Sequence, residues 1–267
     1  MKLVQLSDLA ERHGSDKGWK GPTRTWSANN YVDVYQAYLH DRREEPLSLL
    51  EVGLGVTGPN YETNIVKGRN TGGASMKMWR DYLPNAAITG ADINPAPYLN
   101  SDRVTTYVVD QGSRDSLRQF LKQHPDPSFD VIIDDGSHRA DHQQITLEAL
   151  FPFLKPGGIY FVEDLNDFGF GGRSGNNPYA TPDTISTRDF FKRFGRTGEI
   201  AKPNAFQSTD FLQSVADIAF YCPRPVQRPR DIFWEIVRTV AARAHRGLMR
   251  VEWVPESEKL LALRKLR

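Results

Sequence analysis

The chain has 267 residues, of which 39% are hydrophobic and 25% are charged. These proportions are typical of a globular protein with a buried core, and they exclude a disordered or fibrous one. The 34 Lys and Arg residues nearly balance the 33 Asp and Glu residues, so the net charge of +1 gives no indication of a nucleic-acid partner. The single cysteine, Cys222, excludes an internal disulfide and a metal site built from thiolates.

The sequence contains no apolar run of the 18 or so residues that a membrane-spanning helix requires. Met1, Lys2 and Leu3 lead into a predicted polar helix rather than into the apolar core of a signal peptide. We therefore expect a cytoplasmic protein that has no membrane partner.

Residues 1–45 are predicted to form a helical cap in front of the main domain. Helical spacing of apolar residues covers residues 3–13 and 31–43, and the stretch between them is rich in Gly, Pro and Asn. The main domain is expected to cover residues 46–223.

Strand and helix patterns alternate through that main domain. Apolar runs that end at an acidic residue or a glycine predict strands over residues 47–53, 87–93, 104–110, 129–135 and 158–164. Helical spacing predicts intervening helices over residues 74–83, 115–122 and 142–154, and Pro156, Gly157 and Gly158 are expected to end the last of them. This order predicts an α/β protein with a Rossmann-like, doubly wound, mostly parallel sheet and helices on both faces.

Two further segments follow the fifth predicted strand and the main domain. Residues 166–183 carry aromatic residues among glycines, and we interpret them as a lid over the substrate, with a plain surface loop as the alternative. Residues 224–267 contain 11 basic and 5 acidic residues and predict a basic, amphipathic helical tail with a Leu-rich end. The apolar stripe of this tail suggests a contact between copies of the chain, that is, a homo-oligomer.

The first predicted strand ends in Glu51, Gly53 and Gly55, where glycine lets the backbone approach a ligand. Asp92 ends the second strand, where a carboxylate can accept hydrogen bonds from ribose hydroxyls. The glycines also fit the G-x-G-x-x-G pattern of dinucleotide-binding proteins, but no helix is predicted to begin at them. A cofactor loop and a purely structural turn both remain open.

Acidic residues end the fourth and fifth predicted strands. They are Asp134, Asp135, Glu163 and Asp164, and His138 follows the first pair. The carboxyl ends of adjacent parallel strands open onto one crevice, where such a cluster would repel itself unless a cation neutralised it. Oxygen ligands suit Mg²⁺ or Mn²⁺, and a histidine at this position can act as a base. Helix capping by Asp135 or Ser137 is the structural alternative.

Together these residues resemble the class I S-adenosylmethionine-dependent methyltransferases. More narrowly, they are similar to the metal-dependent sugar O-methyltransferases of macrolide and related natural-product biosynthesis, of the mycinamicin and rhamnose O-methyltransferase type. The resemblance covers about residues 5–165 and includes the segments at residues 13–18 (HGSDKG) and 72–80 (GGASMKMWR).

The resemblance implies a set of residues along S-adenosylmethionine. Ordered from the amino-acid end of the cofactor through its sulfonium and ribose to its adenine, they are Glu51, Gly53, Gly55, Asp134, Asp92, Asp110 and Gln111. Asp134 would lie close to the sulfonium, at the reacting centre.

The resemblance also implies a metal site and a catalytic base. Asp135, Glu163 and Asp164 would ligate Mg²⁺, and His138 would be the general base. The expected reaction is methylation of a sugar hydroxyl in a glycosylated natural product or a nucleotide-sugar, with the metal chelating neighbouring hydroxyls. The expected partner is thus a small-molecule sugar or glycoside. A methyltransferase of the same fold that acts on a catechol or another vicinal diol is the alternative, and an NAD-binding Rossmann protein is a third reading.

Overall fold

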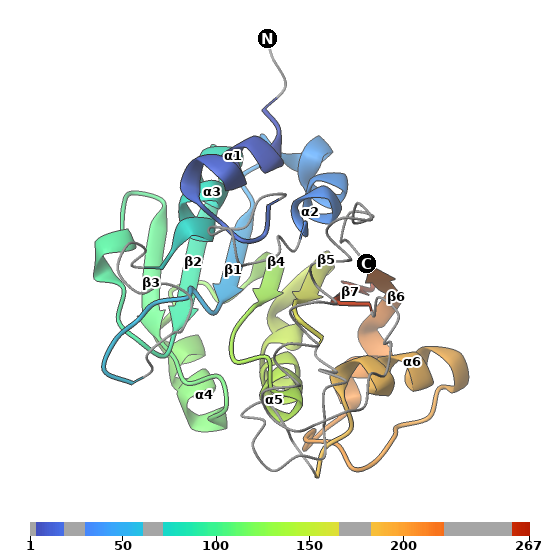
Figure 1. Cartoon of the computed structure of the whole chain (residues 1–267). Helices are drawn as coiled ribbons and strands as arrows, with labels where there is room; N and C mark the ends of the chain where they lie inside the picture. Colours follow the sequence, from blue (N-terminus) through green and yellow to red (C-terminus); the bar gives the residue numbers. More distant parts are fainter. Residues whose placement is uncertain (1–3, 19–29, 61–71, 166–182, 222–257) are drawn as a thin grey trace, which may run out of the picture.

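A computed structural model describes residues 4–18, 30–60, 72–165, 183–221 and 258–267 of the chain (Figure 1). The predicted lid at residues 166–183 therefore lies outside the described residues except for Asp183. The predicted amphipathic helix of the tail lies outside them as well, so the lid and the oligomer contact both stay predictions. No helix in the described parts is long and apolar enough to cross a membrane.

The described residues form one seven-stranded sheet in the order β3-β2-β1-β4-β5-β7-β6. Five strands run parallel: β1 (Ser48–Val52), β2 (Ala87–Asp92), β3 (Val104–Val108), β4 (Phe129–Asp134) and β5 (Leu154–Val162). β7 (Leu260–Lys265) is antiparallel to its neighbours β5 and β6 (Val215–Tyr221). The predicted doubly wound, mostly parallel architecture is confirmed.

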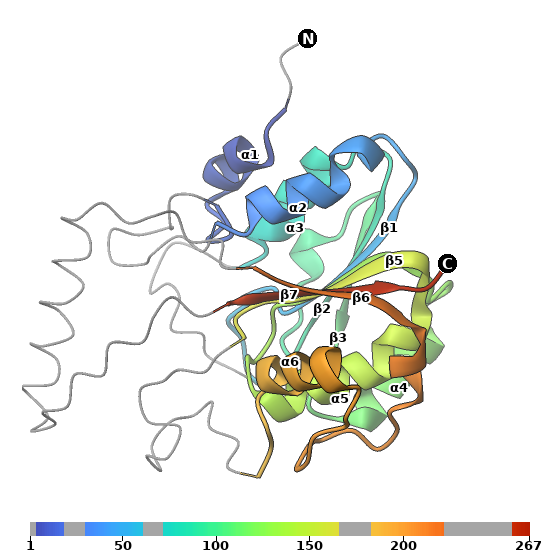
Figure 2. The same ribbon diagram turned by 90° about the vertical axis from the view of Figure 1, so that its right-hand side faces the viewer.

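Helices cover both faces of the sheet (Figure 2). One face carries α1 (Leu6–His13), α2 (Val32–Leu39) and α3 (Ala74–Tyr82), and the other carries α4 (Arg114–Gln123), α5 (Ala140–Leu150) and α6 (Thr187–Thr197). Two hydrophobic clusters fill the space between the layers. Neighbouring residues of a buried strand divide between them: Tyr160 belongs to one cluster and Phe161 to the other.

The N-terminal segment forms two helices, as predicted, and both lie on the face that carries α3. Its second helix is shorter than expected, because α2 ends at Leu39 and a 3₁₀ turn over His40–Arg42 follows. The ring of Tyr35 on α2 packs edge-on against Trp79 of α3 and Phe161 of β5, with centroid distances of 5.3 Å and 4.8 Å. These contacts anchor the segment to the sheet beside the carboxyl ends of the strands.

The boundary between α5 and β5 differs from the prediction. α5 ends at Leu150, a 3₁₀ turn covers Phe151–Phe153, and β5 begins at Leu154. Pro156, Gly157 and Gly158 therefore lie inside the strand and do not end the helix. A Cβ at Gly158 would lie 2.9 Å from the Asp130 carbonyl oxygen, so glycine is required here for the close approach of β4 and β5.

The prediction of a helical tail is wrong for the last residues of the chain. This Leu-rich end forms the strand β7, which lies between β5 and β6 in the sheet. Leu261 and Leu263 belong to one hydrophobic cluster, and Leu260 and Ala262 belong to the other. A strand buried on both faces has a continuous apolar run, which the sequence pattern alone does not distinguish from a short buried helix.

Candidate active site

The carboxyl ends of β1 and β4 approach each other at Gly53. This glycine has φ +89°, and a Cβ on it would lie 2.1 Å from the carbonyl oxygen of Asp135. The amide of Asp135 donates a hydrogen bond to the Val52 carbonyl at 2.8 Å. Only a residue without a side chain fits here, so Gly53 places the residues after β4 directly against the end of β1.

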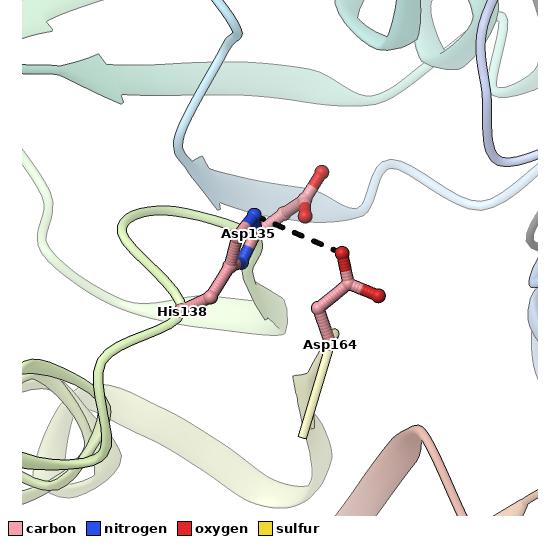
Figure 3. A group of neighbouring side chains, drawn as sticks. All are labelled: Asp135, His138 and Asp164. Carbon is pink, nitrogen blue, oxygen red and sulfur yellow. Dashed lines mark ion pairs between the residues drawn. The ribbon is translucent and has the colours of Figure 1, made fainter. Parts of the chain in front are cut away.

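Three predicted site residues meet just beyond the ends of β4 and β5 (Figure 3). Asp135, His138 and Asp164 each offer one ligand atom, and these atoms lie within 4.8 Å of one another. His138 Nε2 lies 3.7 Å from Asp164 Oδ2. The side chains are about one-fifth exposed, which leaves them accessible to an ion from solvent. Two carboxylates and an imidazole at this spacing can hold a divalent cation.

The backbone at His138 and Asp164 is unusual for residues other than glycine. Their φ angles are +59° and +44°, in the left-handed region. Such conformations cost free energy and persist where the surrounding structure holds them in place. Here they aim both side chains into the same space (Figure 3).

The structure also resolves the helix-capping alternative for Asp135 and Ser137. α5 begins at Ala140 with Arg139 as its N-cap residue, and no side chain caps it. Asp135 Oδ2 instead accepts a hydrogen bond from the ammonium of Lys17. The role of Asp135 is therefore within the carboxylate cluster and not at the start of the helix.

Glu163 points to the inner, buried side of the cluster. Its Oε1 accepts hydrogen bonds from Lys17 Nζ at 2.8 Å and from the hydroxyl of Tyr35. Glu51 lies on the same side, 3.4 Å from Lys17 Nζ, and its Oε2 accepts a hydrogen bond from Trp79 Nε1 at 2.8 Å. Both carboxylates are almost completely buried, and the ammonium of Lys17 offsets their negative charge.

The fold brings into this cluster several residues that were not predicted as site residues. They are Asp16, Lys17, Tyr31, Tyr35 and Trp79. The hydroxyl of Tyr31 donates to Asp164 Oδ1 at 2.6 Å. Lys17 lies in the segment at residues 13–18 that contributed to the family resemblance, which was the available signal. Asp16 has a raised pKa because of its burial and the nearby charge of Asp135.

The protonation tendencies of the cluster follow from burial and charge. Burial raises the pKa of Glu163 well above its ordinary value, and the charge of Asp135 adds to this effect. Burial opposes ionisation of Asp164 too, but the nearby His138 and Lys259 and the hydrogen bond from Tyr31 outweigh it and lower the pKa. Burial also disfavours the charged form of Lys17, yet the surrounding carboxylates raise its pKa well above the usual value. The cluster is thus a strong site for positive charge.

Asp134 at the end of β4 has a carboxylate oxygen that lacks a protein partner. Its Oδ1 accepts a hydrogen bond from Gln111 Nε2 at 3.0 Å, whereas Oδ2 is buried and has no partner among the described residues. Burial raises the pKa of Asp134 to about 7. A buried acceptor without a partner is rare in folded proteins, so this atom fits a donor or a positive charge on a bound molecule.

Three other residues that were predicted to lie along a cofactor, Asp92, Gln111 and Gly55, differ in their surroundings. Asp92 is buried and accepts hydrogen bonds from the amides of Leu54 and Asn94 at 2.8 Å and 2.9 Å. Gln111 holds Asp134 and the amide of Ser137, so it supports the loop after β4. Gly55 has φ +62°, and no atom of the described residues lies within 4 Å of the position of a Cβ on it.

Asp110 borders a surface cavity of 590 Å³ beyond the ends of β2 and β3. The cavity is lined by Pro59, Asn60, Ile93, Val108, Asp110 and Ser116. Two of these residues, Ile93 and Val108, are exposed apolar side chains, with Val108 exposed to 57%. An apolar wall beside an acidic side chain suits a flat, hydrogen-bonding ring such as adenine.

Comparison with known families identifies the central part of this chain. Residues 69–165 match the family model described as a methyltransferase domain. This part of the chain is therefore similar to a methyltransferase domain. The match begins just before α3 and ends at Leu165, so it includes Asp134, Asp135, His138, Glu163 and Asp164. It leaves out Glu51, Gly53, Lys17 and the tyrosines of α2.

Curated relatives of this chain are named as O-methyltransferases of a rhamnosyl tetracenomycin and of mycinamicin VI. The chain is 37% identical over 161 residues to 8-demethyl-8-(2-methoxy-alpha-L-rhamnosyl)-tetracenomycin-C 3'-O-methyltransferase from Streptomyces olivaceus, a match of 60% of this chain and 36% of that protein. It is 33% identical over 147 residues to mycinamicin VI 2''-O-methyltransferase from Micromonospora griseorubida, a match of 54% and 34%. The matches thus span little more than a third of these relatives' length.

The fold of the methyltransferase domain is also that of a solved structure. The MycE methyltransferase from the mycinamycin biosynthetic pathway, in complex with Mg, SAH and mycinamycin VI, aligns with a TM-score of 0.63 at 22% identity. The alignment covers 100% of this chain and 56% of that one.

α3 begins at Ala74, well after Gly58, so the glycines do not open a helix as a dinucleotide-binding motif requires. The class I methyltransferase fold is therefore confirmed, and the NAD-binding reading is not supported.

Proposed function

We propose that this protein transfers the methyl group of S-adenosylmethionine to a hydroxyl of a sugar in a glycosylated natural product, with Mg²⁺ bound beside the transfer site. One observation carries the proposal. Asp134, whose Oδ2 has no partner among the described residues, ends β4, and the group of Asp135, His138 and Asp164 follows the ends of β4 and β5. This arrangement offers a place for a positively charged cofactor and a place for a metal at the same edge of the sheet. The relatives named as sugar O-methyltransferases support the substrate class.

The cofactor would lie across the carboxyl ends of β1, β2 and β4. S-adenosylmethionine supplies a methyl group already activated by a positively charged sulfur. Gly55 leaves room for its amino-acid end, and the free oxygen of Asp134 suits the sulfonium. Asp92 would reach the ribose, and the cavity beside Asp110 has an apolar wall suited to the adenine.

The metal would be held by the carboxylates of Asp135 and Asp164. Mg²⁺ prefers oxygen ligands, and when bound it would orient two neighbouring sugar hydroxyls and make one of them more acidic. Glu163, also predicted as a ligand, keeps its Oε1 on Lys17 and Tyr35. Its contribution to the metal stays a prediction and would involve its second oxygen.

His138 is proposed as the general base. A sugar hydroxyl is almost fully protonated at neutral pH and is a poor nucleophile until its proton is removed. His138 Nε2 would accept that proton, and Asp164 at 3.7 Å would stabilise the imidazolium that forms. Proton transfer of this kind contributes about 10²–10⁴-fold to a rate, and alignment of the oxygen with the methyl group supplies much of the rest.

The first test is calorimetric titration with S-adenosylmethionine and S-adenosylhomocysteine, with and without Mg²⁺. Micromolar binding of both is expected. Methyl transfer is then measured with rhamnosides and with a catechol, in Mg²⁺ and in EDTA. Transfer to the rhamnoside that requires the metal supports the proposal. Absence of cofactor binding would overturn it, and transfer confined to the catechol would replace the sugar with a planar vicinal diol.

A further inference from the structure

Lys17 is a buried ammonium that joins three carboxylates. Its side chain is 1% exposed, and its Nζ bonds to Asp135 and Glu163 and lies 3.4 Å from Glu51. An ammonium this deeply buried is costly unless it is paired on several sides. Lys17 comes from the loop after α1, whereas its partners end β1, β4 and β5. The N-terminal segment therefore contributes a charge at the centre of the cluster.

Two tyrosines of the same segment bind the acidic pair that follows β5. The hydroxyl of Tyr31 donates to Asp164 Oδ1 at 2.6 Å, and that of Tyr35 donates to Glu163 Oε1. Tyr31 and Tyr35 are four residues apart at the start of α2, so they lie on one face of the helix. We call Lys17, Tyr31 and Tyr35 the N-terminal clamp.

The clamp residues are tied to one another through the backbone. The amide of Val32 donates to the Lys17 carbonyl at 3.1 Å, and the amide of Asn30 donates to the Gly18 carbonyl at 3.1 Å. The loop that carries Lys17 is in turn held by the hydrogen bond from the Ser15 amide to the Ala10 carbonyl of α1. These backbone hydrogen bonds connect the clamp residues to α1 and α2.

The clamp holds one oxygen of each carboxylate in a specific way. Lys17 donates a hydrogen bond to Oδ2 of Asp135, and both Lys17 and Tyr35 donate to Oε1 of Glu163. Tyr31 takes Oδ1 of Asp164, while Oδ2 of the same residue lies toward His138. A carboxylate fixed through one oxygen presents the other in a defined direction, which is what a metal with strict octahedral geometry requires.

We propose that the N-terminal clamp is a positioning unit for the metal site: it orients Asp135, Glu163 and Asp164 for the divalent ion and couples binding of that ion to the seating of α1 and α2 on the sheet. The inference rests on the proposed function, because it assumes a divalent ion at these carboxylates. It goes further because it makes the affinity of the site for the metal depend on three residues that lie outside the part matched by the family model.

Mn²⁺ binding to the full chain, measured by calorimetry and by the electron paramagnetic resonance signal of free Mn²⁺, tests this. Lys17→Met should weaken binding by about tenfold or more, because it removes a charged bond from two carboxylates. Tyr31→Phe and Tyr35→Phe should each weaken it by about three- to tenfold. Matched controls are Lys155→Met, whose ammonium pairs with Asp130, and Tyr38→Phe, whose hydroxyl bonds to Tyr221. Both controls should bind Mn²⁺ within about twofold of wild type.

Hydrogen exchange provides a second readout that a purely structural role would not move. Mn²⁺ should slow amide exchange in α1 and α2 of the wild-type protein, because coupling between two events is reciprocal. It should also do so in the Tyr38→Phe control, and the protection should be lost in Lys17→Met.

The outcomes separate the two levels of the argument. If the wild-type protein does not bind Mn²⁺, the proposed metal site is wrong and the clamp fails with it. If the wild type binds Mn²⁺ and folded clamp variants bind it equally well or more tightly, only the positioning role is overturned. Should Lys17→Met fail to fold, the two Phe variants decide, because each removes a single hydroxyl with little change in volume.

Discussion

His138 Nε2 lies 3.7 Å from Asp164 Oδ2, and both residues hold this arrangement through left-handed backbone conformations. The pair joins the loop after β4 to the end of β5. An imidazole placed against a carboxylate can accept a proton and keep the resulting charge stabilised. This relationship makes His138 the residue on which the proposed chemistry depends most directly.

Replacement of His138 by alanine should reduce methyl transfer by about 10²–10⁴-fold, because it removes the proposed base for the hydroxyl proton. Binding of S-adenosylmethionine should stay within about twofold of wild type, since the proposed cofactor contacts lie on other residues. The matched control is His40→Ala, because His40 is exposed in the turn after α2. Turnover assays and calorimetry on the same preparations give both quantities. Near-normal turnover in His138→Ala would exclude it as the base.

Asp134→Asn should weaken the binding of S-adenosylmethionine more than the binding of its product, S-adenosylhomocysteine. The unpartnered Oδ2 of Asp134 is proposed to lie near the sulfonium, which S-adenosylhomocysteine lacks. We expect the affinity for S-adenosylmethionine to fall by about tenfold and that for S-adenosylhomocysteine to change less. Calorimetric titration with each compound measures the difference. An equal loss for both compounds would place Asp134 away from the sulfonium.

Gly53→Ala should be far more damaging than alanine at another left-handed glycine. Gly14 has φ +72°, and no atom of the described residues lies within 4 Å of a Cβ on it, so Gly14→Ala should cost only the conformational term of about 1–2 kcal/mol. At Gly53 the added Cβ would also overlap the Asp135 backbone, which should cost roughly 3 kcal/mol more or prevent folding. Denaturant unfolding of the two variants measures the contrast. Similar free energies of unfolding would contradict the close approach of β1 and β4.

Asp130 provides a prediction about pH and stability. Its carboxylate bonds to Arg42 at 2.9 Å, Lys155 at 2.8 Å and the amide of Ser48 at 3.0 Å. Burial opposes ionisation of Asp130, but these three partners outweigh it and lower the pKa. A lowered pKa contributes stability above the unfolded value of about 4, and this contribution is lost as the pH falls through the folded value.

Asp130→Asn should therefore lower the free energy of unfolding by about 1–3 kcal/mol at pH 7. The difference from wild type should shrink as the pH falls below about 4, because the wild-type carboxyl then becomes neutral too. Urea unfolding at a series of pH values measures both proteins under identical conditions. A difference that stays constant down to pH 3 would show that the ion pairs of Asp130 contribute no net stability.

The alternation of strands and helices was enough to predict the five parallel strands of the sheet and the position of their acidic residues, but neither β6 nor β7. Parallel strands present their carboxyl ends at one edge, so Asp134 and Asp135 at the end of β4 had to lie near Glu163 and Asp164 after β5. The pattern did not identify β7, because a strand buried on both faces between β5 and β6 lacks the alternation that marks a half-buried strand.

The sequence by itself predicted that the acidic residues ending β4 and β5 gather, because these consecutive strands are parallel neighbours in the sheet. Only the tertiary structure decided how those carboxylates divide between an accessible group and a buried one. Lys17 reaches Asp135 across 118 residues and Glu163 across 146, and Tyr35 reaches Glu163 across 128. Partners so far apart leave no periodic signal in the chain, and they meet because α1 and α2 pack over the ends of the strands.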